Sequence, residues 1–348
     1  MTDPLELCKG LTKYVHNSVS ELRGRTVVEM RGPSHPIYQH ETEAENAGLY
    51  FIQKESERNP DLKIGLGFEL LPKWYAVQKG VVSEMDVPTL KEFKPDICIL
   101  SDPIDGSKAD VPVYQSRFGK PIQEGGIYEV FTTAIAFHPD RPTLKDAVAA
   151  ALQRWDGKQF FANQYESLVG FQGEEAIIKS QPLDEIGLHT KFYTGGHYSH
   201  VSPMATFVIE TLLEEIGFPE KQSPGVRSTG STTYDMLQPT MTRSIAFDIR
   251  NDVKKALEKY GVKMRRGAYS HDFAPPAFFA KRAGAFITNL DGTEMNYDLF
   301  VDQTASYFEA PPGEAGKTVL RVLRDKVLPQ IPEKAKEWKI FWEKSNSK

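Results

Sequence analysis

The sequence predicts a mixed α/β (α+β) protein, and three kinds of pattern support this. Apolar residues recur at helical spacing over residues 3–23 and 203–216. Short apolar or β-branched runs, typical of buried strands, occupy residues 97–100 and 128–137. An Asp-Gly pair at 156–157 is a hairpin signal between two further runs, so we expect an antiparallel sheet in the first half of the chain.

The remaining elements follow from the same two periodicities. We expect a helix over residues 41–55 and a short strand at 81–82, whereas the pattern between 65 and 82 is mixed and supports no firm assignment. The second half alternates strands, at 191–194, 244–249 and 285–290, with helices, at 203–216, 274–283 and 318–331. The periodicity lapses around 181–185, so we place two sub-domains at residues 1–185 and 186–348.

Composition and charge exclude several classes of protein. The chain of 348 residues is 40% hydrophobic and 26% charged, which is enough to bury a sizeable core. A net charge of -5, with Lys and Arg spread along the chain, offers no basic patch for nucleic acid. No apolar run is long enough to span a bilayer, and residues 1–10 do not resemble a secretory signal. With Cys8 and Cys98 as its two cysteines, the protein is expected to be cytoplasmic with reduced thiols.

The stretch Ser101-Asp102-Pro103-Ile104-Asp105-Gly106-Ser107 directly follows an apolar strand. Pro103 makes a rigid kink, and Gly106 lets the chain turn and approach a ligand closely. Asp102 and Asp105 repel each other at this spacing unless a cation lies between them. Magnesium is held by such carboxylates together with substrate phosphates. The stretch therefore predicts a metal-dependent phosphoryl site.

The order of four pieces of the chain resembles the inositol monophosphatase and fructose-1,6-bisphosphatase superfamily: Glu84, then residues 102–107, 225–231 and 270–272. The resemblance extends from about residue 41 to residue 292. It implies a layered αβαβα sandwich of two sub-domains with the site between them. It also implies a Mg²⁺-dependent phosphomonoesterase that uses a metal-activated water on a small sugar, cyclitol or nucleotide phosphate. Relatives are often homodimers or homotetramers, and neither nucleic acid nor membrane is an expected partner.

The resemblance assigns metal ligands residue by residue. Two or three Mg²⁺ ions would be held by Glu84, Asp102, the carbonyl of Ile104, Asp105 and Asp272. The physics agrees, because acids gathered at one place cannot all stay charged without cations. Two metals roughly 3.5–4 Å apart would also clamp the attacking and leaving oxygens of the phosphoryl transfer.

The resemblance also assigns the groups that act on phosphate and substrate. Gly106 and Ser107 would present backbone N–H groups to the phosphate. The Ser107 hydroxyl, with Glu41 behind it, would take a proton from the attacking water, and Glu43 is a rival for the role of Glu41. We also expect Lys108, Gly230, Ser231, Thr232 and Arg265 to bind the substrate; of these, Lys108 and Arg265 follow from their positive charge and not from the family pattern.

The chain departs from the family pattern at three positions. Met85 follows Glu84 where the family has a second acid, unless Asp86 serves, and Glu41 stands where the family has Asp. Arg265 stands where inositol monophosphatases carry an acid that binds substrate hydroxyls. Because an arginine fork prefers phosphate or carboxylate, we expect a substrate with a second anionic group. In the alternative, Arg265 lies on a solvated face or contacts a neighbouring subunit.

Two other functions remain open at this point. One is a 3′-phosphonucleotide phosphatase of the bisphosphate nucleotidase type, and the other is an inactive homologue that binds a phosphorylated metabolite. The changes at Met85 and Glu41 keep the second option open. His197 and His200 are expected in a loop rather than at a zinc site. His271 is expected to pack away from Asp272, because neighbouring side chains of an extended segment point in opposite directions.

Overall fold

A computed structural model describes the chain at residues 3–19, 27–30, 36–69, 74–105, 130–171, 173–187, 189–194, 203–217, 225–227, 231–262, 267–301 and 303–346. The chain forms two compact units. The first comprises residues 1–178, 270–282 and 296–302, and the second comprises 179–269, 283–295 and 303–348. The first boundary between the units follows residue 178, whereas the sequence pattern predicted it after residue 185. The division also places the segment that carries Asp272 in the first unit.

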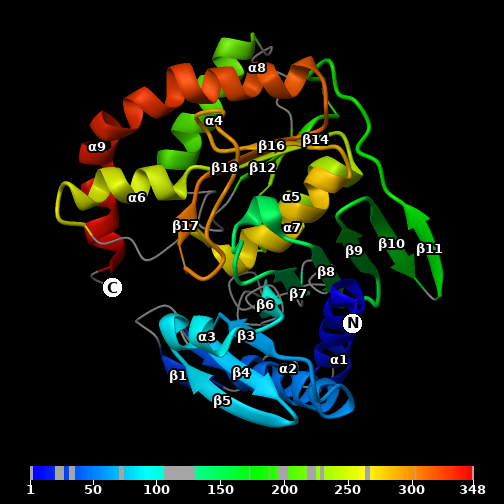
Figure 1. The fold of residues 1–348 in the computed structure, drawn as a ribbon. Helices are drawn as coiled ribbons and strands as arrows, with labels where there is room; N and C mark the ends of the chain where they lie inside the picture. The colour runs from blue at the N-terminus through cyan, green and yellow to red at the C-terminus, as the bar shows by residue number, and fades with distance from the viewer. Residues whose placement is uncertain are drawn as a thin grey trace, which may run out of the picture. The chain divides into compact units, whose positions relative to one another are not determined.

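The first unit is built on a nine-stranded mixed sheet (Figure 1). From edge to edge, its strands are β11 (Glu174–Ile177), β10 (Ser167–Phe171), β9 (Gln159–Asn163), β8 (Ala149–Arg154), β7 (Phe131–Phe137), β6 (Ile97–Asp105), β3 (Ile64–Phe68), β4 (Trp74–Gln78) and β5 (Val81–Met85). Within this sheet β3 and β6 are parallel, and all other neighbours are antiparallel. The expected antiparallel hairpin is present as β8 and β9, and Gly157 in its turn has a φ of 93°, which favours glycine. A separate ladder pairs β1 (Val27–Met30) with β2 (Pro36–Tyr38).

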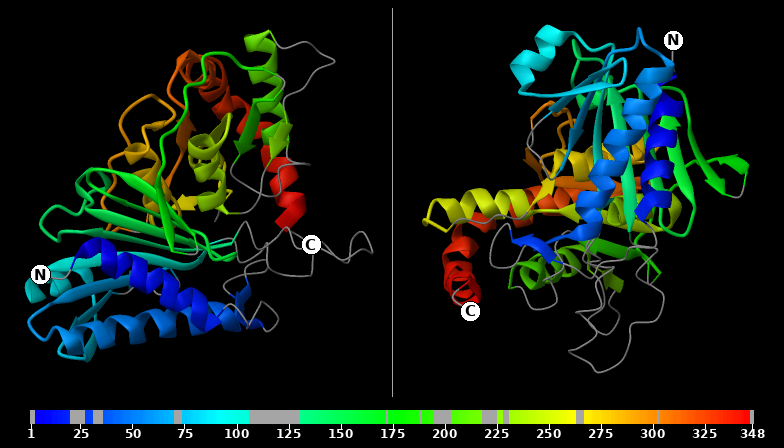
Figure 2. Two further views of the ribbon diagram at one scale, coloured as in Figure 1. Left: turned by 90° about the vertical axis from the view of Figure 1, so that its right-hand side faces the viewer. Right: turned by 90° about the horizontal axis from the view of Figure 1, so that it is seen from below.

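Helices cover both faces of this sheet. Helices α1 (Pro4–Val19) and α2 (Gln39–Arg58) run side by side on one face, as Figure 2 shows, over a core that includes Ile99 and Ala136. Helix α7 (Ser270–Arg282) lies on the opposite face, where Phe279 meets the Phe160 ring at 5.8 Å and accepts a hydrogen bond from Ser167. These contacts explain why the Asp272 segment belongs to the first unit. Helix α3 (Val87–Phe93) packs close to β3.

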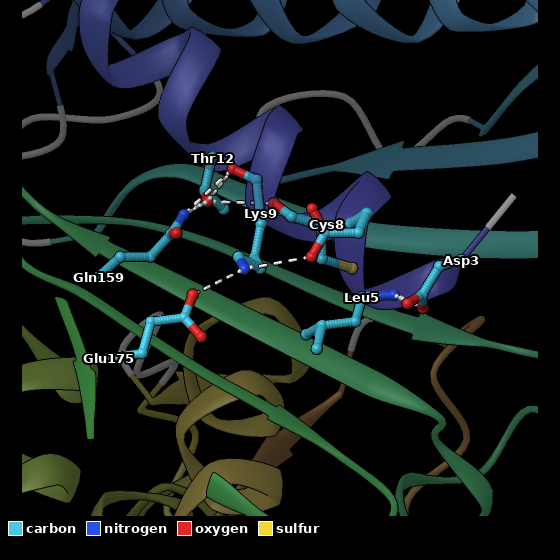
Figure 3. Close-up of polar contacts among 8 residues, drawn as sticks. Asp3, Leu5, Cys8, Lys9, Thr12, Gln159 and Glu175 are labelled. Atoms are coloured by element: carbon cyan, nitrogen blue, oxygen red, sulfur yellow. Dashed lines mark hydrogen bonds and ion pairs between the residues drawn. The ribbon is translucent and has the colours of Figure 1, made fainter. Parts of the chain in front are cut away.

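Polar contacts dock α1 onto the strands at the far edge of the sheet (Figure 3). Gln159 Nε2 donates to the Lys9 carbonyl and to Thr12 Oγ1, each at 3.1 Å. Lys9 Nζ lies 3.2 Å from Glu175 Oε1 and 4.2 Å from the centre of the Phe161 ring. Burial alone would lower the pKa of Lys9, but its hydrogen bonds to Glu6 and Glu175 raise it overall.

The second unit has a five-stranded sheet of its own. Its strands, in order, are β13 (Gly225–Arg227), β12 (Lys191–Thr194), β14 (Ser244–Asp248), β18 (Tyr307–Ala310) and β16 (Phe286–Thr288). Strand β12 is parallel to β13 and β14, whereas β18 is antiparallel to β14 and β16. A short antiparallel ladder pairs β15 (Ala268–Tyr269) with β17 (Thr304–Ala305). The expected strands of this half are thus present, with small shifts of their bounds.

One apolar core of the second unit lies between its sheet and several helices. The helices on that face are α4 (Pro203–Ile216), α6 (Arg250–Glu258), α8 (Glu314–Val322) and α9 (Ile331–Asn346). The expected helix over 318–331 is helical throughout, but it is not a single α-helix, because a π-turn and a 3-10 turn join α8 to α9. Pro329 lies in that 3-10 turn, and proline cannot donate the hydrogen bond that a continuing helix needs. In the described part of the chain, every helix is too short or too polar to cross a bilayer.

The other face of this sheet carries buried polar groups under α5 (Thr232–Met241). Thr240 Oγ1 donates to Glu309 Oε1 at 3.2 Å. Burial raises the pKa of Glu309 well above its usual value, and the hydrogen bond from Thr240 opposes this only in part. The pKa of Tyr307 is also raised, first by burial and then by the negative charges of Asp248 and Asp235.

Candidate metal centre

Strand β6 carries two buried acids in a segment that is not a regular strand. Asp102 is 1% exposed and Asp105 is 6% exposed. The register with β7 shifts between them, because Asp102 pairs with Thr133 and Asp105 pairs with Phe131. Three steps along β6 thus match two steps along β7, which is a β-bulge of one extra residue. In a regular strand, residues three apart face opposite sides, so the bulge is what lets both acids serve one site.

Local hydrogen bonds hold the bulge in place. Ile104 N donates to Asp102 Oδ1 at 2.9 Å, and Thr132 Oγ1 donates to the Pro103 carbonyl at 2.8 Å. Pro103 has no N–H and therefore leaves no unsatisfied donor at the irregular point of the ladder. The sequence Asp-Pro-Ile-Asp thus produces both the kink and the first anchor of the Asp102 carboxylate.

Asp272 completes a group of three carboxylates. It lies in the first turn of α7 and is half-buried. One oxygen from each of Asp102, Asp105 and Asp272 can be chosen so that all three lie within 4.8 Å of one another. The structure therefore brings together three acids that the sequence separates by up to 170 positions. All three belong to the first unit.

The electrostatics of this group point to a bound cation. Burial raises the pKa of Asp102 well above its usual value, and the negative charges of Glu69, Asp105 and Asp272 raise it further. Asp102 Oδ2 is buried and has no hydrogen-bond partner among the described residues. A buried carboxylate oxygen that faces other carboxylates is costly unless a cation binds it. The donors are hard oxygens, which fit Mg²⁺ better than a soft transition metal.

Glu69 is the acid that sequence reasoning missed. Strands β3 and β6 are parallel, and Phe68 pairs with Ser101. Glu69, the residue after the end of β3, therefore lies beside Asp102 of β6. Of the three neighbouring charges, Glu69 has the largest effect on the pKa of Asp102. The sequence did contain a signal for Glu69, because an acid at the end of a short apolar segment also marks Asp102. The alternating glycines Gly65 and Gly67 obscured that segment as a strand.

Glu84 does not belong to this group. It lies exposed on the edge strand β5 and pairs with Tyr75, which in turn pairs with Leu66. Leu66 is level with Ile99, which precedes Asp102 by a full three residues. With Glu45, Glu84 adds to the rise that burial causes in the pKa of Tyr75. Asp86, the alternative for the missing acid, caps α3 by accepting from Thr89 N at 2.9 Å.

The other predicted site residues divide into described and undescribed positions. Glu41 is half-buried in the first turn of α2, and Glu43 is exposed. Ser231 belongs to the second unit, where its Oγ caps α5 by accepting from Tyr234 N, and Thr232 is the first residue of that helix. Ile104 lies buried in the bulge. Outside the described residues lie Gly106, Ser107, Lys108, His197, His200, Gly230 and Arg265.

The sequence suggested that His271 points away from the acids, and this expectation is wrong. The segment is the start of a helix rather than an extended strand, so adjacent side chains lie about 100° apart instead of on opposite faces. His271 Nε2 lies 3.5 Å from Asp272 Oδ1 and 3.8 Å from Glu69 Oε1. The ring is therefore beside the acids of the centre.

Comparisons with known proteins give the fold. No family model matches the sequence, and no curated protein matches it. Among solved structures, the extragenic suppressor protein SuhB from Bartonella henselae superimposes with a TM-score of 0.60 at 13% identity, over 92% of this chain and 98% of that chain. The Thermotoga maritima IMPase gives 0.57 at 15% identity, over 93% and 96%. A staphylococcal IMPase complexed with products gives 0.57 at 14% identity, over 92% and 94%. The protein therefore has the fold of the inositol monophosphatase superfamily.

Proposed function

We propose that this protein is a Mg²⁺-dependent phosphomonoesterase that acts on a small phosphorylated sugar, cyclitol or nucleotide. The observation that carries the proposal is the convergence of Asp102, Asp105 and Asp272, whose oxygens lie within 4.8 Å of one another. The fold adds support, because proteins with this fold include several named as inositol monophosphatases. The buried, unbonded Asp102 Oδ2 favours a bound cation over a purely structural cluster of acids.

Each residue of the centre has a definite task in this proposal. Asp102, Asp105 and Asp272, with Glu69 and the carbonyl of Ile104, would hold the divalent ions. When bound, such ions neutralise the acids and lower the pKa of a bound water, which can then attack phosphorus. The bulge in β6 keeps the Asp102 and Asp105 carboxylates oriented before any ion or substrate arrives. Such preorganisation suits phosphoryl transfer, which depends mainly on positioning and charge stabilisation.

The groups around the ions come from the sequence pattern. Backbone N–H groups of Gly106 and Ser107 would bind the phosphate, and the Ser107 hydroxyl would accept a proton from the attacking water. Glu41 is the acid proposed to take that proton onward, and its half-buried position at the start of α2 suits a group that must exchange protons. Arg265 and Lys108 would favour a substrate with a second anionic group.

A substrate panel tests the proposal directly. We expect phosphate release from at least one of inositol monophosphate, fructose 1,6-bisphosphate and 3′-phosphoadenosine 5′-phosphate in the presence of Mg²⁺, and none after its removal by EDTA. Asp102→Asn should abolish release, whereas Asp61→Asn, at an exposed site in the first unit, should not. Release that survives EDTA would refute the proposal. No release from any substrate, despite bound Mg²⁺, would favour the inactive homologue.

A further inference from the structure

His271 occupies a position in the centre that the proposed ligand set does not use. The side chain is 5% exposed, in the first turn of α7. Its Nε2 lies 3.5 Å from Asp272 Oδ1 and 3.8 Å from Glu69 Oε1. Both separations are longer than a hydrogen bond of about 2.7–3.2 Å, so a small side-chain rotation is enough to form one.

His271 is not part of the carboxylate group itself. Among the described residues, Asp102, Asp105 and Asp272 each place a ligand oxygen within 4.8 Å of the others, and both His271 and Glu69 lie beside this group rather than in it. Nitrogen is also a poor ligand for Mg²⁺, which prefers oxygen. A role one layer out from the ion fits this position better than direct coordination.

Glu69 is the acid of the centre that most needs orientation. Its side chain is 31% exposed, compared with 16% for Asp272. Glutamate has one more rotatable bond than aspartate, so fixing its carboxylate costs more conformational entropy. Asp102, by contrast, is buried and already anchored by the hydrogen bond from Ile104 N. A donor beside Glu69 therefore has the largest effect on how well the site is preorganised.

We propose that His271 is a positioning residue, whose Nε2–H donates to the Glu69 carboxylate and fixes the orientation in which Glu69 binds a divalent cation. The inference rests on the proposed function, because it requires a metal ion at the centre. One Glu69 oxygen faces the ion and the other accepts from His271, which a carboxylate with several lone pairs allows. Removing such an outer partner typically lowers metal affinity about 10–100-fold.

Manganese binding measures this role without any use of activity. Free Mn²⁺ is counted by electron paramagnetic resonance as the full-length protein is titrated. His271→Phe keeps an aromatic ring but removes the donor, and we expect affinity to fall about 10-fold or more. His271→Gln places an amide N–H at a similar reach and should restore most of the affinity. His138→Phe is the matched control in the same unit and should leave affinity unchanged, because His138 lies at the opposite end of β7, where its Nδ1 is 3.3 Å from the Asp96 carbonyl.

The outcomes separate this inference from the proposed function. If the unchanged protein binds no Mn²⁺, the metal centre and the inference both fail. If it binds Mn²⁺ and His271→Phe binds equally well, the inference fails and the metal centre stands. Equal losses in the Phe and Gln variants would also overturn the inference, because the ring would then act by packing alone.

A second variant covers the case in which His271→Phe does not fold. His271→Asn is smaller, and its amide is too short to reach Glu69, so its affinity should fall as for Phe. In a Glu69→Gln background, His271→Asn should cause no further loss, since the two residues act as one unit. A full additional loss in that background would refute the pairing.

Discussion

Replacing Asp102 by asparagine should make the metal-free protein more stable and remove its stabilisation by Mg²⁺. Asparagine keeps the Oδ1 atom that accepts from Ile104 N at 2.9 Å. It replaces Oδ2, which has no partner among the described residues, by an NH₂ group that can donate to neighbouring carboxylates. The change also removes one of the negative charges that Glu69, Asp105 and Asp272 now oppose.

The size of the effect follows from the burial of the site. A hydrogen bond to a charged group contributes about 1.5–3 kcal/mol, so the free energy of unfolding without metal should rise by about that amount. In the unchanged protein, Mg²⁺ at about 100 times its Kd should add ~2.7 kcal/mol. For a unit of roughly 200 residues, each kcal/mol moves Tm by about 2–4 °C. Both differences are therefore well within the range of a thermal melt.

The assay is thermal denaturation followed by circular dichroism in EDTA and in Mg²⁺. Asp102→Asn should melt at a higher temperature than the unchanged protein in EDTA, and should gain nothing from Mg²⁺. Asp61→Asn should behave as the unchanged protein in both buffers. A lower Tm for Asp102→Asn in EDTA would show that the buried acids do not repel each other as argued. An equal gain from Mg²⁺ in both proteins would place the ion elsewhere.

Three further predictions concern single side chains. Glu69→Gln should weaken Mn²⁺ binding about 10-fold or more in the magnetic-resonance titration, whereas Glu84→Gln should not. Equal losses of affinity in the two variants would contradict the choice of Glu69 over Glu84, which rests on the register between β3 and β6. Because the pKa of Glu309 is raised above its usual 4.5, folding takes up a proton above pH 4.5, and stability should fall by about 1.4 kcal/mol per pH unit up to the folded pKa. Glu309→Gln should flatten that slope above pH 4.5 in urea denaturation, and an unchanged slope would show that another group causes it. Lys9→Met keeps the side-chain stem over Phe161. It should lower the free energy of unfolding, measured by urea denaturation, by about 0.2–1 kcal/mol, because the ion pair with Glu175 is partly solvated. A loss above about 2 kcal/mol would show a much stronger ion pair.

The sequence was most informative where one short segment carried the whole signal. The apolar run before Ser101 and the Asp-Gly turn at 156–157 predicted β6 and the β8–β9 hairpin from neighbouring residues alone. Local patterns did not distinguish the α-helical turns of α8 and α9 from the π-turn and the 3-10 turn that join them. Amphipathic spacing indicates which face of a helix is buried, but it does not indicate where a backbone hydrogen-bond donor is missing.

The centre itself could be predicted only in part, because no local sequence pattern determines the order of strands in a sheet. Asp102, Asp105 and Asp272 were identified from motifs, but the choice between Glu69 and Glu84 depends on which strand lies beside β6. Both acids follow or lie in short strands, and only the parallel pairing of β3 with β6 brings Glu69 level with Asp102. The position of His271 likewise depends on whether its segment is helical or extended, which three residues of motif do not decide.

The extra residue in β6 has a consequence for how this chain tolerates length changes. Deleting Ile104 would restore an uninterrupted ladder with β7, and as a sheet the result would be more regular. The same deletion would leave the two acids two residues apart and still on one face, but it would remove the buried Ile104 side chain and the carbonyl proposed to bind an ion. The extra residue therefore supplies a proposed ligand and a core side chain between two acids that share a face either way, and selection for activity would maintain an imperfection that selection for pairing alone would remove.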